Sequence, residues 1–231
     1  MRVMSASGFY ERQHGRVEID ILPDGWLTAA AVSQEGVAVA ALRRACDILG
    51  SLTLLVLTLP LLLLTALAIR LESPGPVLYR QDRVGRHGRV FRLFKFRSMT
   101  VDAERDGPCW AAPCDPRVTR VGHFIRQTRI DEIPQVLNVL RGEMALIGPR
   151  PERPAFVEHL TAVIPHYASR TAVRPGITGW AQVNYPYGAS VEDARNKLAY
   201  DLYYLRHRNL TLDLSIVLGT VRVVLLQTGA R

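Results

Sequence analysis

Residues 48–69 read ILGSLTLLVLTLPLLLLTALAI and contain no charged side chain. About 20 apolar residues of helix are enough to cross the roughly 30 Å hydrocarbon layer of a membrane, so this run is long enough to do so. It begins too far from Met1, and its apolar part is too long, for a secretory signal peptide. A helix buried in a protein core is the remaining alternative. We therefore expect a membrane segment.

Pro60 and the charges beside the run bear on how it enters the membrane. A proline near the middle of a helix removes a backbone donor and clashes with the preceding turn, which a kinked span tolerates. Arg43 and Arg44 precede the run, and Arg70, Arg80, Arg83 and Arg86 follow it. Because positive residues favour the cytoplasmic side, both ends are drawn to the cytoplasm. A re-entrant helix-break-helix hairpin is therefore favoured over a straight span.

The charge of the whole chain indicates an anionic partner. Its 231 residues carry 29 Lys and Arg against 21 Asp and Glu, a net charge of +8. Nucleic acid, anionic lipid head groups and phosphorylated substrates all fit that charge. Arginine dominates the basic residues, and its planar guanidinium suits phosphate. The three cysteines show neither a metal-ligand nor a disulfide pattern, which indicates a reducing compartment.

We predict an α+β fold in three parts: a polar N-terminal extension over residues 1–42, the re-entrant membrane hairpin over 43–72, and a single compact cytoplasmic domain over 73–231. Residues 77–83 and 89–96 are expected to form a β-hairpin. Apolar spacing predicts an amphipathic helix over residues 155–167, with Phe156, Leu160, Val163 and Ile164 on one side. Asp213 and Arg222 interrupt the apolar segment 210–227, which favours a helix packed on the core or lying at the membrane interface.

Asp131 and Glu132 are the first candidates for chemistry. Pro134 is tolerated only in the first turn of a helix, so a helix is expected to begin close to Asp131 and to end at Gly142. The positive end of its dipole would keep both acids ionised. An ionised Asp can attack phosphorus or bind a hard cation such as Mg²⁺. The structural alternative is a capping box formed by Thr128 and Asp131.

Arginines flank this pair in the sequence. Arg126 and Arg129 precede it, and Arg150 follows within a GPRP turn whose glycine lets a ligand approach closely. An acid pair among arginines suits phosphoryl transfer, which depends on positioning and charge neutralisation. Each arginine can equally be a surface charge or an ion-pair partner of the same acids. A second basic cluster either holds anionic lipid head groups or binds the phosphate of a lipid: Arg83, Arg86, Lys95 and Arg97.

Several motifs together resemble a known family. They are KFRSM at 95–99, DPRVTRVG at 115–122, RQTRIDEIPQVLNVLRGEMALIGPRPERP at 126–154, VRPGITGWAQVNYPYGAS at 173–190 and YDLYYLR at 200–206. In order and spacing they resemble the bacterial sugar transferases, the monotopic phosphoglycosyl transferases that start glycan assembly on undecaprenyl phosphate. The resemblance covers about residues 43–231. PYGAS and the terminal GAR resemble the exopolysaccharide branch associated with exosortase systems.

The resemblance implies a two-step reaction in the catalytic domain. Asp131 would attack the β-phosphate of a UDP-sugar and expel UMP, and a polyprenyl phosphate would then attack the phosphosugar–aspartyl intermediate. Glu132 matches the second acid, which assists Mg²⁺ binding or proton transfer, so Mg²⁺ is the expected cofactor, held by Asp131 and Glu132. The phosphates are expected to meet five basic side chains: Arg126, Arg150, Lys95, Arg97 and Arg174.

The resemblance also implies a location and partners. The membrane helix would break at Pro60. In familiar members of the family a serine precedes this proline and its hydroxyl supports the break. Here Leu59 occupies that position, so Thr58 would supply the hydroxyl. The domain would lie on the cytoplasmic face of the bacterial inner membrane, with membrane lipids but no nucleic acid as partners. The sequence identifies neither the sugar nor the oligomeric state. The rival function is a non-catalytic basic membrane protein that binds lipid or nucleic acid, which would release no UMP; the few aromatic residues and the lack of a nucleic-acid motif oppose it.

Overall fold

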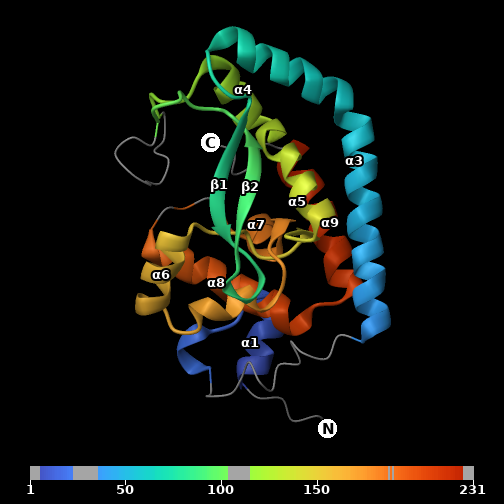
Figure 1. Ribbon diagram of the computed structural model, residues 1–231. Coiled ribbons are helices and arrows are strands. Elements are labelled where there is room, and N and C mark those ends of the chain that lie inside the picture. Colours follow the sequence, from blue (N-terminus) through green and yellow to red (C-terminus); the bar gives the residue numbers. More distant parts are fainter. Residues whose placement is uncertain (1–5, 23–35, 104–114, 187, 189, 226–231) are drawn as a thin grey trace.

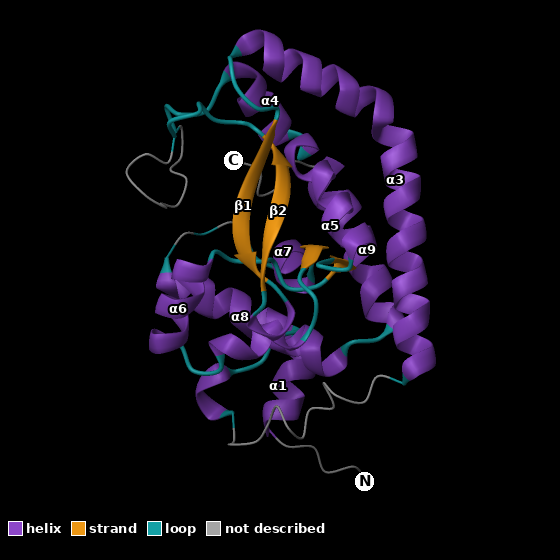
Figure 2. Ribbon diagram, in the orientation of Figure 1, coloured by secondary structure: helices purple, strands orange, loops and turns teal. Residues whose placement is uncertain are grey.

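The computed structural model describes residues 6–22, 36–103, 115–186, 188 and 190–225; Cys109, Cys114, the terminal GAR and part of PYGAS lie outside them. Helices dominate and strands form two small two-stranded sheets (Figure 2). In chain order the elements are α1 Ala6–His14, η1 Ile19–Ile21, α3 Val37–Glu72, β1 Leu78–Val84, η2 Arg86–Gly88, β2 Val90–Phe96, α4 Arg120–Gln127, η3 Ile130–Gln135, α5 Val136–Arg141, β3 Ala145–Ile147, α6 Pro154–Val163, η4 Tyr167–Ala172, β4 Gly176–Thr178, α7 Trp180–Asn184, α8 Val191–His207 and α9 Leu210–Leu225. The predicted mixture of helices and strands is confirmed.

The apolar run lies in α3, a single helix of 36 residues with Pro60 in its interior. By length and composition α3 can cross a membrane: its most apolar window has a mean hydropathy of 2.6, and 17% of that window is buried inside the protein. Such low burial excludes a core helix. Figure 1 shows α3 bending, so that its two arms follow two sides of the domain.

The predicted break in this helix is not observed. The backbone stays helical from Val37 to Glu72, because a proline inside a helix can kink it without ending it. The Thr58 hydroxyl donates to the Leu54 carbonyl, 2.7 Å away. The carbonyl that Pro60 leaves without its helical donor is that of Val56, four residues back, so Thr58 does not replace the missing bond.

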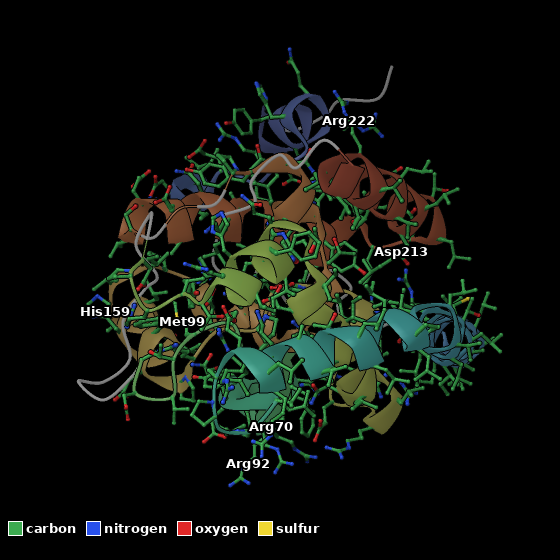
Figure 3. All side chains as sticks on the ribbon, turned by 90° about the horizontal axis from the view of Figure 1, so that it is seen from above. Arg70, Arg92, Met99, His159, Asp213 and Arg222 are labelled. Atoms are coloured by element: carbon green, nitrogen blue, oxygen red, sulfur yellow. The ribbon has the colours of Figure 1, made fainter. Side chains whose placement is uncertain are left out.

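Polar side chains fasten the first arm of α3 to the domain. Arg43 forms an ion pair with Asp213 of α9. Arg44 donates to the carbonyls of Val139 (2.6 Å) and Leu140 (2.8 Å) at the end of α5. Asp47 accepts a bond from the Leu146 amide in β3, 2.9 Å away. Figure 3 shows Asp213 next to this arm, seen end-on.

The second arm of α3 is fastened to the same domain. Glu72 accepts hydrogen bonds from the backbone amides of Arg120 and Val121, the first residues of α4, at 2.8 and 3.2 Å. Ile69 is buried in one apolar cluster with Phe96 of β2 and with Ile125 and Ile130, and Leu62 and Ala66 pack against that cluster. Both ends of the apolar helix therefore lie against one folded unit.

The predicted hairpin is confirmed: β1 and β2 pair antiparallel, with Leu78 opposite Phe96 and Val84 opposite Val90. The parallel pair of β3 and β4 was not predicted, because each strand has three residues and lies among turns. Gly148 and Gly176 permit this pairing. A Cβ on Gly176 would lie 2.1 Å from the Gly148 nitrogen, and one on Gly148 would lie 2.4 Å from the Arg174 carbonyl oxygen, so larger residues cannot pack here.

The N-terminal extension is partly built into the domain. Val17 and Ile19 are buried in a cluster with residues of α6 and α8. Glu11 is 1% exposed and pairs with Arg206 and His207 at the end of α8, at 3.1 and 2.9 Å. This packing was not foreseen, because the apolar partners of the segment lie about 140 or more residues away in the sequence.

Two further helices occur close to where they were expected. In α6, Leu160 is buried and Phe156 packs on the same cluster, as does Ile164 just after the helix ends. Val163 is 49% exposed, which contradicts its predicted place on the apolar side, because α6 ends there. The segment 210–227 contains α9, in which Ile216 is buried.

Candidate active site

One large cavity of about 1350 Å³ lies beside Asp131 and Glu132. Its charged side chains come mainly from the β1–β2 hairpin, α4, η3, the GPRP turn, η4 and α8, and α3, β4, α7 and α9 contribute uncharged ones. The predicted acids thus lie in the wall of a space large enough for a nucleotide sugar.

The acids lie in a 3-10 helix, η3, which α4 and Arg129 position. Thr128 is the C-cap of α4 and its hydroxyl donates to the Phe124 carbonyl, so the capping box considered as the structural alternative is not formed. Arg129 follows with a left-handed φ of 60°, a conformation unfavourable for a residue with a Cβ, and it turns the chain so that η3 starts at Ile130. Regular α-helix begins only at Val136 and ends at Gly142, which confirms the predicted stop.

Glu132 is held by two cations. Lys95 donates to Oε1 at 2.8 Å, and Arg150 donates to both oxygens, at 2.5 and 3.2 Å. Burial acts to raise the pKa of Glu132, but Arg150 and Lys95 outweigh it and hold that pKa well below its usual range. Burial in turn lowers the pKa of Lys95. Glu132 is therefore a fixed anion that orients two cations toward the cavity.

Asp131 is buried, with 7% of its surface exposed, and it has no hydrogen bond or ion pair among the described residues. Burial raises its pKa to about 6; Lys95 opposes the shift and Glu132 adds to it. With a pKa of about 6 the carboxylate is mostly ionised at neutral pH. Neighbouring cations rather than a helix dipole favour the ionised form, since Asp131 lies in the first turn of a short 3-10 helix. A desolvated, unpaired carboxylate facing a cavity is available as a nucleophile or a metal ligand.

Two of the predicted arginines face this space. Arg126 lines the cavity from α4 and is close enough to favour the ionised form of Asp131. Arg150 extends from the GPRP turn, which is held by bonds from the Gly148 amide to the Thr178 carbonyl (2.9 Å) and from the Gly176 amide to the Pro149 carbonyl (2.9 Å). The GPRP turn and strand β4 thus form one mount for Arg150.

Two other predicted phosphate ligands are placed differently. Arg97 is 6% exposed and donates to the Ser73 and Pro74 carbonyls at 2.8 and 2.9 Å, so it fixes the chain after α3 even though it borders the cavity. Arg174 is absent from the described lining of the cavity and lies within electrostatic reach of Asp47 on α3. Neither guanidinium is presented to Asp131 as Arg150 is.

A second charged cluster in the cavity wall was missed. Arg170 pairs with Asp201 at 2.8 Å and donates to the Tyr167 hydroxyl at 2.7 Å and to the Arg150 carbonyl at 2.9 Å. Asp201 is 2% exposed, and burial raises its pKa to about 6 against the opposing effect of Arg170. Asp201 lies in the YDLYYLR motif, the one available signal; nothing in the sequence near Arg170 indicates its partner.

The donor set at the acids suits a cation that arrives with phosphate. The described residues hold no group of three or more His, Cys, Asp or Glu side chains that could enclose a metal ion. Mg²⁺ usually binds through one or two carboxylates together with substrate phosphates. Asp131 offers free oxygens for this, whereas both oxygens of Glu132 already accept bonds from cations.

Comparisons with known proteins identify a matching family and several relatives of this chain. A family model described as bacterial sugar transferase matches residues 38–227. A UDP-N-acetylgalactosamine-undecaprenyl-phosphate N-acetylgalactosaminephosphotransferase of Aeromonas hydrophila is 48% identical over 94% of this chain and 51% of its own length. A UDP-glucose:undecaprenyl-phosphate glucose-1-phosphate transferase of Caulobacter vibrioides is 47% identical over 84% of this chain and 73% of its own.

A shorter relative matches over nearly its whole length. The exopolysaccharide production protein PSS of Rhizobium leguminosarum is 41% identical over 78% of this chain and 93% of its own length. The chain spans about half the length of the Aeromonas protein, so that protein contains further sequence outside the match.

Proposed function

This chain belongs to the bacterial sugar transferase family, and from that premise we propose that it transfers a sugar-1-phosphate from a UDP-sugar to a polyprenyl phosphate, with release of UMP. The observation that carries the proposal is Asp131, a buried carboxylate without a partner, set beside the fixed group of Glu132, Lys95 and Arg150 in a cavity that reaches α3. The relatives' names include undecaprenyl phosphate and two different UDP-sugars, so the sugar is left open.

The first step forms a covalent intermediate. An Asp131 oxygen attacks the β-phosphorus of the UDP-sugar, a bond forms between that oxygen and phosphorus, and the bond from the β-phosphorus to the oxygen bridging the two phosphates breaks. UMP leaves with that oxygen. Arg150 and Lys95, held toward the cavity by Glu132, neutralise charge that gathers on the phosphate oxygens. Arg126 lies on the same cavity wall and adds a third cation.

The second step releases the product. A phosphate oxygen of the polyprenyl phosphate attacks the same phosphorus, the bond to Asp131 breaks, and a polyprenyl diphosphate sugar forms. Asp131 returns as a carboxylate, so the chain is unchanged after each cycle. Splitting the reaction in two lets one nucleophile serve a soluble donor and a lipid acceptor in turn.

Mg²⁺ is proposed as the cofactor. Asp131 would hold it together with the diphosphate oxygens, and Glu132 would reach it only if Arg150 or Lys95 moved. When bound, the ion neutralises diphosphate charge. Arg126 and Arg150 would orient the remaining phosphate oxygens.

The contacts of α3 support a re-entrant course through one leaflet. Arg44 and Asp47 bind the first end of α3 to the domain, and Glu72 binds its second end to the same domain. We therefore propose that both ends of α3 lie on the cytoplasmic face of the bacterial inner membrane. A cysteine at position 12, exposed on α1, should then resist an impermeant thiol reagent in intact cells and react after permeabilisation. Labelling in intact cells would show a straight span instead.

Exchange of labelled UMP into a UDP-sugar without any acceptor tests the central proposal. The purified chain, given UDP-glucose or UDP-N-acetylgalactosamine with Mg²⁺, should catalyse this exchange with one of them, because the first step is reversible. Addition of undecaprenyl phosphate should convert exchange into net UMP release. Release that requires the acceptor, with no exchange in its absence under any donor, would indicate direct transfer and contradict the covalent step.

A further inference from the structure

The cavity at Asp131 has two walls of opposite character. Its charged lining residues come from the β1–β2 hairpin and the segments around it, α4, η3, the GPRP turn, η4 and α8. None of its described lining residues from α3, β4, α7 or α9 is charged. The apolar members of this uncharged wall include Leu54, Ile177, Ala181, Val183, Val223 and Val224.

We propose that the uncharged wall, from Leu54 to Val224, binds the isoprenoid chain of the acceptor, with the acceptor phosphate at Asp131. The inference rests on the proposed function and adds the location of the acceptor. A polyisoprenoid phosphate has one charged end and a long hydrocarbon chain. It therefore needs a cationic site and an apolar surface that are continuous with each other, and this cavity supplies both.

The polar groups of this wall are largely turned away from a ligand. The hydroxyls of Thr178 and Thr220 bond each other at 2.7 Å, and Thr220 also donates to the Ile216 carbonyl at 2.7 Å. The Asn184 amide donates to the Trp180 carbonyl at 2.9 Å. The exception is Gln182, whose Nε2 donates to the Ile177 carbonyl but whose Oε1 is buried without a partner among the described residues. Apart from this acceptor the wall offers mainly methyl groups, which suits hydrocarbon better than the hydroxyls and base of a nucleotide sugar.

The wall continues into an exposed apolar surface on α9. Val224 is 42% exposed, and Leu214, Leu218 and Val221 of the same helix are 59%, 63% and 51% exposed. Leu54 lies on α3 among residues that are mostly exposed and apolar. A lipid chain can therefore pass from the membrane to the cavity along α3 and α9 without exposing its length to water.

A competing entrance exists at the other end of the cavity. Val77, Met99 and Val101 form a smaller apolar rim near the end of α3, and Val101 is 62% exposed. Figure 3 shows Met99 well apart from Arg222, the neighbour of Val223 on α9, so the two entrances can be blocked separately. The rim lies beside the charged residues Arg97 and Arg117, which disfavours hydrocarbon there.

Bulky substitutions distinguish these routes in the full chain. Val223→Trp fills the uncharged wall and Val101→Trp fills the competing rim. Val163→Trp is the matched control, because Val163 lies on α6, is 49% exposed and is absent from the cavity lining. Each is assayed for UMP exchange without acceptor and for the KM of undecaprenyl phosphate and of the shorter farnesyl phosphate. Exchange in the unmodified chain is the separate test of the proposed function.

Val223→Trp should raise the KM for undecaprenyl phosphate about tenfold. A change of this size corresponds to the loss of apolar contacts by roughly two methylene groups of the lipid. The KM for the shorter farnesyl phosphate should rise less. Its UMP exchange should stay within about twofold of the unmodified chain, as should every parameter of Val163→Trp. An unchanged KM in Val223→Trp, an equal rise in Val163→Trp, or a rise in Val101→Trp alone would overturn the proposed location.

Discussion

Two buried clusters of acids and bases border the same cavity and balance their charges differently. Glu132 meets two cations, Arg150 and Lys95, whereas Asp201 meets one, Arg170, which also donates to Tyr167. The pKa of Glu132 is accordingly held well below its usual range, while that of Asp201 is raised to about 6. In a desolvated wall one guanidinium does not offset the burial of a carboxylate, and two cations do.

The clusters are joined through the backbone. Arg170 donates to the carbonyl oxygen of Arg150, 2.9 Å away, so the second cluster supports the turn that presents the first. Asp131 stands beside the first cluster but takes no bond from it among the described residues. We infer a division of work in which Asp131 reacts, the Glu132 cluster stabilises charge, and the Asp201 cluster positions the GPRP turn.

The largest effect is expected at Asp131. Asp131→Asn keeps the size of the side chain and removes its charge and nucleophile, so turnover and UMP exchange should both fall by at least about 10⁴-fold. Thermal unfolding should change little, because the carboxylate has no described partner to lose. Substantial turnover by a folded Asp131→Asn variant would contradict its assignment as nucleophile.

Removal of divalent metal should act on the first step and leave the folded protein intact. Excess EDTA should abolish UMP exchange, and Mg²⁺ should restore it, because the diphosphate carries clustered negative charge. The melting temperature without substrate should stay the same, since the ion is expected to enter with the donor. Exchange that continues at full rate in excess chelator would rule out the proposed cofactor.

Isosteric amides compare the two clusters directly. Glu132→Gln removes the carboxylate that pairs with Lys95 and Arg150 and should lower kcat/KM by roughly 10² to 10³-fold. Asp201→Asn leaves Arg170 its bonds to Tyr167 and to the GPRP turn and should cost about tenfold, mainly in KM. If Asp201→Asn costs as much as Glu132→Gln and lowers kcat alone, the second cluster takes part in the chemistry directly.

The smallest expected effect is on the pH dependence of the unfolding free energy, which should have opposite signs for Asp201 and Glu132. The pKa of Asp201 is raised, from 3.8 to about 6, so its proton is held more tightly in the folded chain, and its contribution to stability falls as pH rises from about 4 to 6. The full fall is about 3 kcal/mol. The pKa of Glu132 is lowered, so its contribution is present above its unfolded pKa and is lost as pH falls.

Unfolding free energies of the unmodified chain and of Asp201→Asn, measured in detergent between pH 4 and 7, test this sign. The amide should make the variant gain stability relative to the unmodified chain as pH rises. Glu132→Gln should show the reverse trend. A difference between the unmodified chain and Asp201→Asn that stays constant with pH would show that Asp201 keeps an ordinary pKa.

The same contrast separates what could be foreseen from what could not. Asp131, Glu132, Arg126 and Arg150 were predicted because they lie within 25 residues of one another in motifs with a recognisable chemical pattern. Arg170 and Asp201 lie 31 positions apart, and neither segment contains a local signal for the other. Arg97 was assigned to phosphate as part of the basic cluster that follows the apolar run, yet its guanidinium donates to two carbonyls near the end of α3.

The apolar helix, the β1–β2 hairpin and the acid pair could be predicted from the chain, because hydrophobic runs, alternation and adjacent charges are local properties. Long-range packing sets the other features: α3 bends without breaking, both its arms meet one domain, residues 6–22 pack on α8, and the turns at Gly148 and Gly176 mount Arg150. The tertiary structure also pairs the carboxylate of Glu132 with two cations and leaves that of Asp131 without a partner among the described residues. Burial and cation contacts set the pKa of each acid, and they depend on residues brought together from distant positions, which no local pattern encodes.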